Sequence, residues 1–442
     1  MTDPKRIVIL GASGLIGQAI AADLSVRGLS VMAVARRFTP AQRHAFRPDA
    51  REMPLAECDA PKLARLLDEY AADVVVNCLG TLQDRPGESV RAVHDGFAQR
   101  LIAALRAAAR PALLAHISIP GGKDGDRTDF SRSKRDAERL IRASGLPYVI
   151  LRPGFVWAPS AYGGSALMRA LAALPAGLPA FEGNRPFSVV AVEDIAETIA
   201  VLAQRWRPEK PQQAAVWDVM HPERTTIAGV LNALRDWLGT APRVFVTMPE
   251  VLLDLGARAG DLVSRLGWAP PIRSTALAEL RRGVTGDPKA WMAATGIAPR
   301  SLAAVLKQRP ATLQDKWFAR LFLLKSLVIA ILVAFWCVSG LIALTIAYKP
   351  AVAILTAHGQ SETFAHAATN FSSLMDISIG IAIAIRRVCG IGLIAGILAS
   401  LFYMIASAFM TPDLWVEPLG ALVKTGPAIV LMLVALATLD NR

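Results

Sequence analysis

The sequence has only four cysteines among its 442 residues, and they are widely scattered. Cys58, Cys78, Cys337 and Cys389 follow neither zinc-site nor disulfide spacing, so we expect reduced thiols and no metal. The chain also lacks runs of Lys and Arg interleaved with aromatic residues, despite a net charge of +12. Nucleic acid is therefore not an expected partner. This net positive charge either attracts the protein to an anionic membrane surface or results from a basic composition that implies no partner.

Charged residues are sparse in the last quarter of the chain, where apolar residues accumulate. We predict membrane spans near residues 326–348, 363–385, 388–410 and 418–439. The first and third hold no charge, the second holds only Asp376, and the fourth holds only Lys424. Each is long enough to cross a hydrocarbon core of ~30 Å as a helix. The sequence therefore predicts a multi-pass membrane domain of four helices over residues 326–442.

Basic residues gather on one side of these spans. They are Lys316, Arg320, Lys325, Arg386, Arg387 and Arg442. Because basic loops stay in the cytoplasm, we expect both termini there and a location in a bacterial inner membrane. The opening residues MTDPKRIVIL contain no leader with a cleavage site, which agrees with a cytosolic head on a lipid-embedded anchor.

The head begins with IVILGASGLIG, an apolar run followed by three glycines. The run is typical of a buried strand, and the residues up to Gly28 are typical of a helix. A turn at which phosphate approaches the backbone requires residues without a β-carbon, and the helix start offers N–H groups to a pyrophosphate. We therefore expect a dinucleotide at this turn. The expected contacts are Gly11, Ser13, Gly14, Leu15, Ile16 and Gly17.

Further apolar runs alternate with helical stretches over the first 155 residues. They lie at Ser30–Ala35, Asp73–Gly80, Ala112–Ile119 and Tyr148–Gly154, and Arg51–Leu55 is a candidate third strand. This alternation predicts an α/β fold, a Rossmann-type doubly wound parallel sheet whose ligand crevice lies at the carboxyl ends of the strands. Later helical stretches at residues 226–238 and 249–266 are amphipathic or apolar. They face either the core or a substrate.

Several side chains near these strand ends are candidate cofactor contacts. Arg36 and Arg37 come about 20 residues after the glycine turn, where an acidic residue would bind the ribose of NAD. Two guanidinium groups instead suit the 2′-phosphate of NADP, unless they are ordinary solvated arginines. Asp59 either accepts from the adenine amine or is a plain surface carboxylate. The end of the fourth strand adds Cys78, Leu79 and Gly80.

The motifs GASGLIG, NCLG, HIS and LRPGFVWAP, in this order, resemble the short-chain dehydrogenase/reductase superfamily. They are most similar to its atypical extended branch, which is related to the NAD(P)-binding accessory subunit of respiratory complex I and to NmrA-like proteins. Phe181–Glu197 resembles the segment that closes the cofactor pocket. The resemblance covers about residues 5–300. It implies a nicotinamide cofactor, with further contacts at Pro153, Phe155 and Val156; with Arg36 and Arg37 in place, we expect NADP(H) to be preferred and NAD to be possible.

The chemistry of this family uses a Tyr-x-x-x-Lys pair and a serine. Ser118 matches the serine and Lys134 the lysine, but Phe130 stands at the tyrosine position and has no proton to give. Either Ser118 and Lys134 act with a hydroxyl from elsewhere, for which Tyr162 is the one tyrosine to name, or the head binds NADP(H) without the usual catalysis. Tyr162 is otherwise a simple loop residue.

The four spans, with SLMDISIGIAIAIRR as the most informative segment, resemble a DoxX-type membrane domain. Asp376 marks either a paired interior site or a span boundary. We expect an NAD(P)-binding domain over residues 1–310, with its core in 1–157 and a lid and substrate lobe in 158–310. A linker over 311–325 joins it to the membrane domain.

Three functions follow from these expectations. The first is a membrane-tethered NADP(H)-dependent oxidoreductase or isomerase that acts on an apolar or quinone-like molecule from the bilayer. The second is a non-catalytic NADP(H)-binding sensor or a structural subunit of a membrane complex, which Phe130 favours. The third, a nucleotide-regulated transporter, depends on Asp376 alone.

Overall fold

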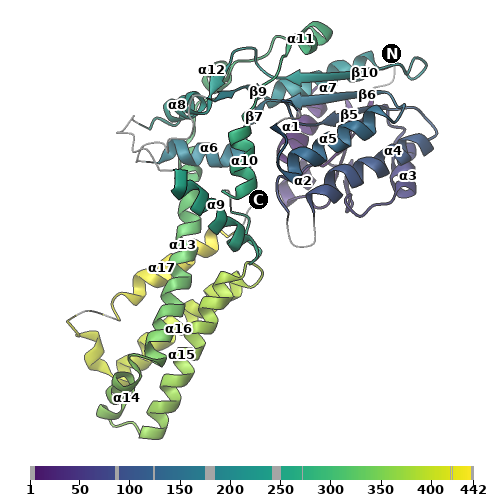
Figure 1. Ribbon diagram of the computed structural model, residues 1–442. Helices are drawn as coiled ribbons and strands as arrows, with labels where there is room; N and C mark the ends of the chain where they lie inside the picture. Colours follow the sequence, from purple (N-terminus) through teal and green to yellow (C-terminus); the bar gives the residue numbers. More distant parts are fainter. Residues whose placement is uncertain are drawn as a thin grey trace. The chain divides into compact units, whose positions relative to one another are not determined.

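The computed structural model describes residues 5–84, 89–122, 125–174, 185–240, 250–270, 272–418, 420 and 422–439. The chain divides into two compact units. The head unit comprises residues 1–261 and 271–319, and the membrane unit comprises residues 262–270 and 320–442. The head unit is an α/β structure and the membrane unit is helical (Figure 1).

A seven-stranded parallel sheet forms the centre of the head unit, in the order β10-β6-β5-β4-β1-β2-β3. Its strands are β1 Arg6–Leu10, β2 Ser30–Ala35, β3 Ala50–Glu52, β4 Val74–Asn77, β5 Leu113–Ile117, β6 Tyr148–Pro153 and β10 Ala214–Val219. The first six confirm the predicted strands. The strand order reverses between β1 and β4, and a ligand crevice forms outside the carboxyl ends at such a point.

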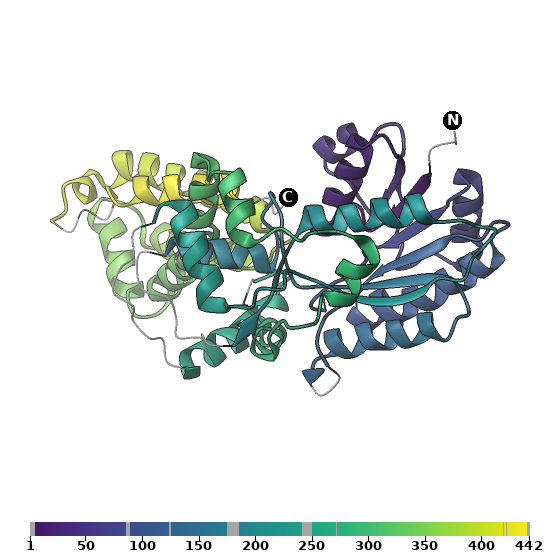
Figure 2. The same cartoon turned by 90° about the horizontal axis from the view of Figure 1, so that it is seen from above.

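Both faces of the sheet are covered by helices (Figure 2). On β1, Ile7 and Ile9 belong to one hydrophobic core, while Val8 and Leu10 belong to the other. All four side chains are fully buried, because a parallel strand between two helical layers has no solvent face. The first core includes α1 Leu15–Val26 and α7 Val192–Arg205; the second includes α3 Ala60–Tyr70, α4 Phe97–Ala107 and one side of α5 Asp129–Arg142.

Shorter elements complete the head unit. The strands are β7 Phe155–Trp157, β8 Pro186–Phe187, β9 Val189–Ala191 and β11 Thr225–Thr226. The helices are α2 Pro40–Ala45, the π-helical turn Ala92–Gly96, α6 Gly164–Ala173, α8 Ile227–Leu238, α9 Glu250–Ser264, α10 Ser274–Arg282, α11 Lys289–Thr295 and α12 Leu302–Gln308. Helix α9 ends in the membrane unit. The segment Phe181–Glu197, expected to close the cofactor pocket, begins outside the described residues, which resume at residue 185.

Among the residues that the structure describes, three helices are long and apolar enough to cross a bilayer. They are α13 Leu313–Leu344, α15 Glu362–Ala384 and α16 Cys389–Met410. The fourth predicted span coincides with α17 Thr425–Ala437, whose 13 residues extend only ~20 Å, so the four-helix count is approximate. Helix α13 begins inside the stretch that we predicted as a linker. The connections are α14 Tyr348–Ala357 and the 3₁₀ turn Pro412–Trp415.

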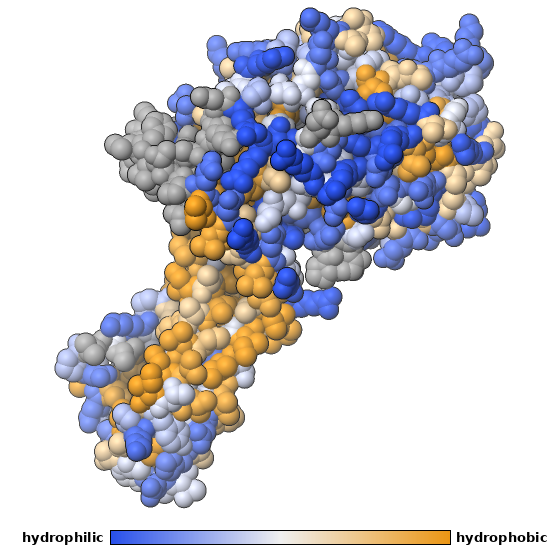
Figure 3. All heavy atoms as spheres, viewed as in Figure 1, coloured by the Kyte–Doolittle hydropathy of each residue, from blue (hydrophilic) through white to orange (hydrophobic). Residues whose placement is uncertain are grey.

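Glycines allow close packing inside the bundle. A β-carbon on Gly340 would lie 2.5 Å from the Ser373 carbonyl oxygen, and one on Gly396 would lie 2.7 Å from the Met432 sulfur. The outer surface of the bundle is strongly hydrophobic (Figure 3). Phe409, for example, is 84% exposed. Such a surface is stable in lipid rather than in water.

Candidate functional site

The turn between β1 and α1 is shaped by its glycines. Gly11 has a φ of +86°, and a β-carbon there would lie 3.1 Å from the Leu79 nitrogen of the neighbouring strand end. A β-carbon on Gly17 would lie 2.5 Å from the Gly11 carbonyl oxygen. Gly14 is the N-cap of α1 and has no side chain over the helix start. The turn therefore leaves the first N–H groups of α1 open to an anion such as a pyrophosphate.

Most predicted cofactor residues lie at the carboxyl edge of the sheet, around the point where the strand order reverses. They are Ser13 to Ile16 at the start of α1, Arg36 and Arg37 after β2, Cys78 to Gly80 after β4, Lys134 in α5, Pro153 at the end of β6, and Phe155 and Val156 in β7. Arg36 and Arg37 are both exposed. Asp59 is the N-cap of α3, where its Oδ1 accepts a 2.8 Å hydrogen bond from the Lys62 amide.

Lys134 is held at this edge by two backbone oxygens. Its Nζ donates to the carbonyl of Leu79 at 3.0 Å and to that of Ile117 at 2.9 Å, at the ends of β4 and β5. The side chain is buried, and this burial lowers the pKa of Lys134 to about 8. A β-carbon on Gly80 would lie 3.4 Å from Nζ, so this glycine keeps space beside the ammonium group. Burial also raises the pKa of the nearby Cys78 thiol to about 12, which keeps it protonated.

Two buried histidines, neither of which was predicted as a site residue, order the loop after β4. His94 Nε2 accepts from the Thr81 amide at 3.2 Å, so its Nδ1 carries the proton and faces Ser133 Oγ at 2.8 Å. Burial, assisted by the charge of Lys134, lowers the pKa of His94 to about 2.

The second of these histidines is His116, on β5. Its Nδ1 accepts from the Asn77 side-chain amide at 3.1 Å, and Asn77 Oδ1 in turn accepts from the Leu79 amide at 3.1 Å. Burial holds the pKa of His116 far below its usual value. His94 and His116 are therefore neutral supports of the Leu79–Thr81 backbone that receives Lys134. Neither is a titrating acid or base.

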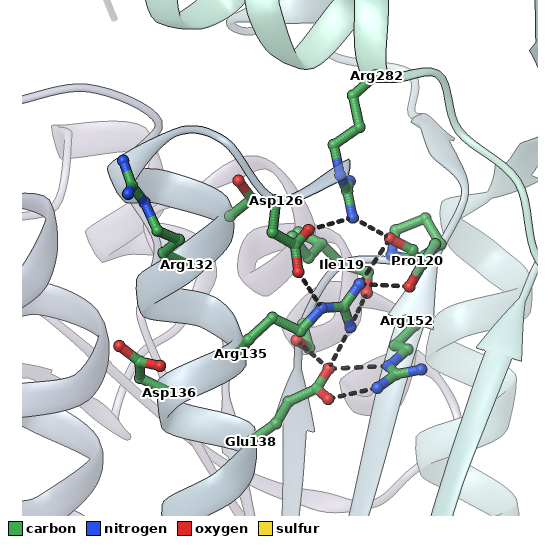
Figure 4. Close-up of polar contacts among 12 residues, drawn as sticks. Ile119, Pro120, Asp126, Arg132, Arg135, Asp136, Glu138, Arg152 and Arg282 are labelled. Atoms are coloured by element: carbon green, nitrogen blue, oxygen red, sulfur yellow. Dashed lines mark hydrogen bonds and ion pairs between the residues drawn. The ribbon is translucent and has the colours of Figure 1, made fainter. Parts of the chain in front are cut away.

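Ser118 is not free at the end of β5. Its Oγ donates a 2.6 Å hydrogen bond to Oε1 of Glu138, a residue of α5 that the sequence analysis also missed. The same carboxylate accepts from Arg152 Nε at 2.8 Å and from Arg135 Nη1 at 3.1 Å (Figure 4). Burial alone would raise the pKa of Glu138, but the hydrogen bonds from Arg152 and Ser118 outweigh it and hold the pKa below its usual value.

The ion network continues from Glu138 through Arg135. Arg135 Nε contacts the Asp126 carboxylate at 2.9 Å, and Arg282 Nη2 from α10 contacts it at 2.8 Å (Figure 4). Arg282 also donates to the Pro120 carbonyl at 2.6 Å. The network thus connects α5, the loop after β5 and α10. Its arginines and carboxylates are almost fully paired with one another, which is typical of a structural cluster.

Phe130, at the start of α5, packs its ring edge-on against His94, with ring centroids 5.5 Å apart. A cavity of about 330 Å³ lies beside Phe130, which forms part of its wall. Its lining residues are Leu82, Gln83, Asp84, Val90, Thr128, Asp129, Phe130, Arg132, Ser274, Thr275 and Ala278. Tyr162 lies just before α6 and does not line this cavity. The described residues contain no group of His, Cys, Asp or Glu able to hold a metal ion.

Comparison with known protein families agrees with both units. Residues 11–200 match the NAD(P)H-binding family model, and residues 333–433 match the DoxX-like family model. The chain therefore carries an NAD(P)H-binding domain, followed by a DoxX-like domain with apolar candidate spans. The open start of α1 and the glycines that a β-carbon would block fit the dinucleotide of this class.

Individual relatives match parts of the chain. The dTDP-6-deoxy-L-talose 4-dehydrogenase (NAD(P)(+)) of Kitasatospora kifunensis is 34% identical over 116 residues, 26% of this chain and 36% of that protein. The ceramide reductase of Caulobacter vibrioides is 26% identical over 207 residues, 46% of this chain. The chain thus spans only 36% and 62% of these relatives. The UDP-glucose 4-epimerase of Thermotoga maritima shares the fold, at 13% identity and a TM-score of 0.52 over 72% of this chain and 99% of that one.

Proposed function

We propose that the protein is a membrane-anchored, NADP(H)-dependent oxidoreductase or isomerase that acts on an apolar or membrane-associated small molecule. The observation that carries this proposal is the cavity of about 330 Å³ whose wall includes Phe130. In the family that the motifs resemble, this position belongs to the residue that touches the substrate. A protein that only binds a nucleotide does not need a cavity at this position.

The main predicted cofactor groups each receive a role in this proposal. The glycine turn holds the pyrophosphate, Arg36 and Arg37 hold the 2′-phosphate, and Lys134 holds the nicotinamide ribose. NADPH is therefore the preferred cofactor. When bound, it supplies a hydride, and reduction of a carbonyl then needs a proton as well. Phe130 has none to give, and the proton of Ser118 is engaged by Glu138. We assign the proton to Lys134, whose lowered pKa of about 8 leaves it able to donate near neutral pH.

The membrane domain supports a substrate from the bilayer, because tethering raises the local concentration of such a molecule. The similarity to a ceramide reductase supports a lipid-like substrate as well. We further propose that the chain lies in a bacterial inner membrane with both termini in the cytoplasm. Single cysteines at Ser361 and Asp413, which precede α15 and follow α16, test this orientation. Labelling of either site from the cytoplasmic side alone would overturn it.

A second candidate function is a non-catalytic NADP(H)-binding sensor or subunit. Two observations favour it: Phe130 replaces the proton-donating tyrosine, and the Ser118 hydroxyl points its proton at Glu138. The fold and the cofactor turn are the same in both candidates. Only a measurement of NADPH turnover distinguishes the enzyme from the binding protein.

The experiment that distinguishes these two functions uses the full chain in lipid nanodiscs. NADPH binding is measured first, and consumption of bound NADPH is then followed with a panel of aldehydes, ketones and quinones of different chain length. We expect turnover with long-chain members, and we expect Phe130→Tyr to raise it. Tight binding without turnover, unchanged in both Phe130→Tyr and Ser118→Ala, would instead establish the binding protein.

A further inference from the structure

Helix α9, Glu250–Ser264, exposes an apolar stripe. Val251 is 74% exposed, Leu255 62% and Leu262 62%. Their spacing of i, i+4 and i+11 places them on one face of the helix. Arg258, at i+7, lies on the same face and is also exposed. A long cationic side chain among exposed apolar residues is typical of helices in the headgroup region of a membrane.

The opposite face of α9 is packed inside the head unit. Leu253 and Ala257 form a small core with Leu277 of α10. A β-carbon on Gly260 would collide with the Ile272 carbonyl oxygen, so the helix and the following segment touch through their backbones. The exposed stripe is therefore not a loosely held helix. Its orientation is fixed by this inner face.

Two ion pairs strengthen this attachment. Arg281 contacts Asp254 at 3.0 Å, and Arg273 contacts Asp261 at 3.0 Å. Both pairs connect α9 with α10 or with the residue just before it. Helix α10 in turn supplies Ser274, Thr275 and Ala278 to the wall of the cavity beside Phe130. The packed pair of helices thus carries an exposed apolar stripe on α9 and a cavity wall on α10.

The carboxyl end of α9 leads directly into the membrane unit. Residues 262–270 belong to that unit, where they contact the end of α15 and the residues after it. The Trp268 indole N–H donates to the Ala384 carbonyl at 2.6 Å, and the Arg386 amide donates to the Leu266 carbonyl at 3.0 Å. The Arg386 guanidinium lies 5.6 Å from the Trp268 ring centroid. Tryptophan and arginine at the end of a candidate span mark the level of the lipid headgroups.

We propose that α9 lies in the headgroup region of the bilayer, with Val251, Leu255 and Leu262 among the acyl chains. The partner is an anionic lipid surface, since Arg258 of α9 and Arg265 just after it are both basic and exposed. We infer lipid rather than another protein as the partner, because the carboxyl end of α9 belongs to the membrane unit. Given the proposed function, on which this consequence rests, α10 connects the lipid-bound helix α9 to the wall of the cavity. The substrate class is then an amphipathic lipid.

The test measures the depth of α9 directly. The full chain is reconstituted in nanodiscs of phosphatidylcholine and phosphatidylglycerol, and a polarity-sensitive fluorophore is attached to Leu255→Cys or Val251→Cys. The matched control is Arg65→Cys, an exposed residue of α3. The signal of the labelled parent chain, with its own cysteines, is subtracted. NADPH binding by each variant is measured separately, so a failure of the lipid contact is distinguishable from a failure of the proposed function.

With acyl-chain-brominated lipids, we expect labels on α9 to lose about half of their emission, because interfacial helices insert roughly 5–10 Å. The α3 label should lose none. Equal emission from α9 and α3 labels in brominated and ordinary lipid would overturn the proposal. A blue-shifted α9 label without quenching would also overturn it, since that result places the stripe against protein, such as a second copy of the chain.

Discussion

The Ser118 hydroxyl donates its proton to the Glu138 carboxylate at 2.6 Å, inside a cluster that also holds Arg135 and Arg152. A serine that the motifs assign to the substrate is thus part of the framework that holds α5 against the sheet. Lys134 is on the same helix, four residues before Glu138. The position of the cofactor lysine therefore depends on this cluster.

The first prediction concerns the carboxylate of that cluster. Glu138→Gln removes the charge that Arg135 and Arg152 share, and breaking a buried pair in this way costs ~3–5 kcal/mol. We expect a clearly lower melting temperature of the full chain. Asp136→Asn is the matched control on the same helix, because its ion pair with Arg139 is exposed and should cost ~1 kcal/mol or less. Equal effects of the two substitutions would contradict the role given to the cluster.

The second prediction concerns the pH dependence of stability without cofactor. The pKa of Lys134 is about 8 in the folded chain and 10.5 when unperturbed, so the unfolded chain binds more protons between these values. The free energy of unfolding should therefore rise with pH across this window, by up to roughly 1.4 kcal/mol per pH unit. Lys134→Met should lack this contribution. Chemical unfolding of both proteins between pH 7.5 and 10 measures it, and parallel curves would refute the lowered pKa.

A third prediction separates the glycines of the turn. Gly17→Ala places a β-carbon 2.5 Å from the Gly11 carbonyl oxygen, which forces α1 away from β1. We expect lower stability and loss of NADPH binding. At Gly14 a β-carbon would meet only the Gly11 oxygen at 3.4 Å, so Gly14→Ala should keep the melting temperature. It should still weaken NADPH binding, because the added methyl group lies beside the pyrophosphate. If Gly14→Ala unfolds the head, this account of the turn fails.

The fourth prediction concerns cofactor choice. The double substitution Arg36→Ala and Arg37→Ala removes both cations proposed for the 2′-phosphate, each a charged hydrogen bond of about 1.5–3 kcal/mol. We expect NADPH to bind at least tenfold more weakly and NADH to bind as before. Isothermal calorimetry with both cofactors tests this directly. Equal losses for NADPH and NADH would assign these arginines another role.

Much of the head could be predicted from local patterns, because buried parallel strands produce continuous apolar runs. Strand β10 was not predicted because it lies at the edge of the sheet, where Val219 is its one fully buried residue. Glu138 and His94 were not predicted for a different reason. From the sequence alone, a buried charged or polar residue in a helix cannot be told from one that faces solvent. Only the tertiary contacts show that its partners come from elsewhere in the chain. Composition does not set the ends of the fourth span, because apolar residues lie on both sides of the 13 residues of α17.

The central claim is that the head holds a nicotinamide dinucleotide at the turn between β1 and α1, and the most direct measurement is a calorimetric titration of the full chain in nanodiscs. We predict saturable heat with NADPH, weaker binding of NADH, and no heat with NADPH after Gly17→Ala. Absence of heat with both cofactors in the unmodified, folded protein would contradict the account.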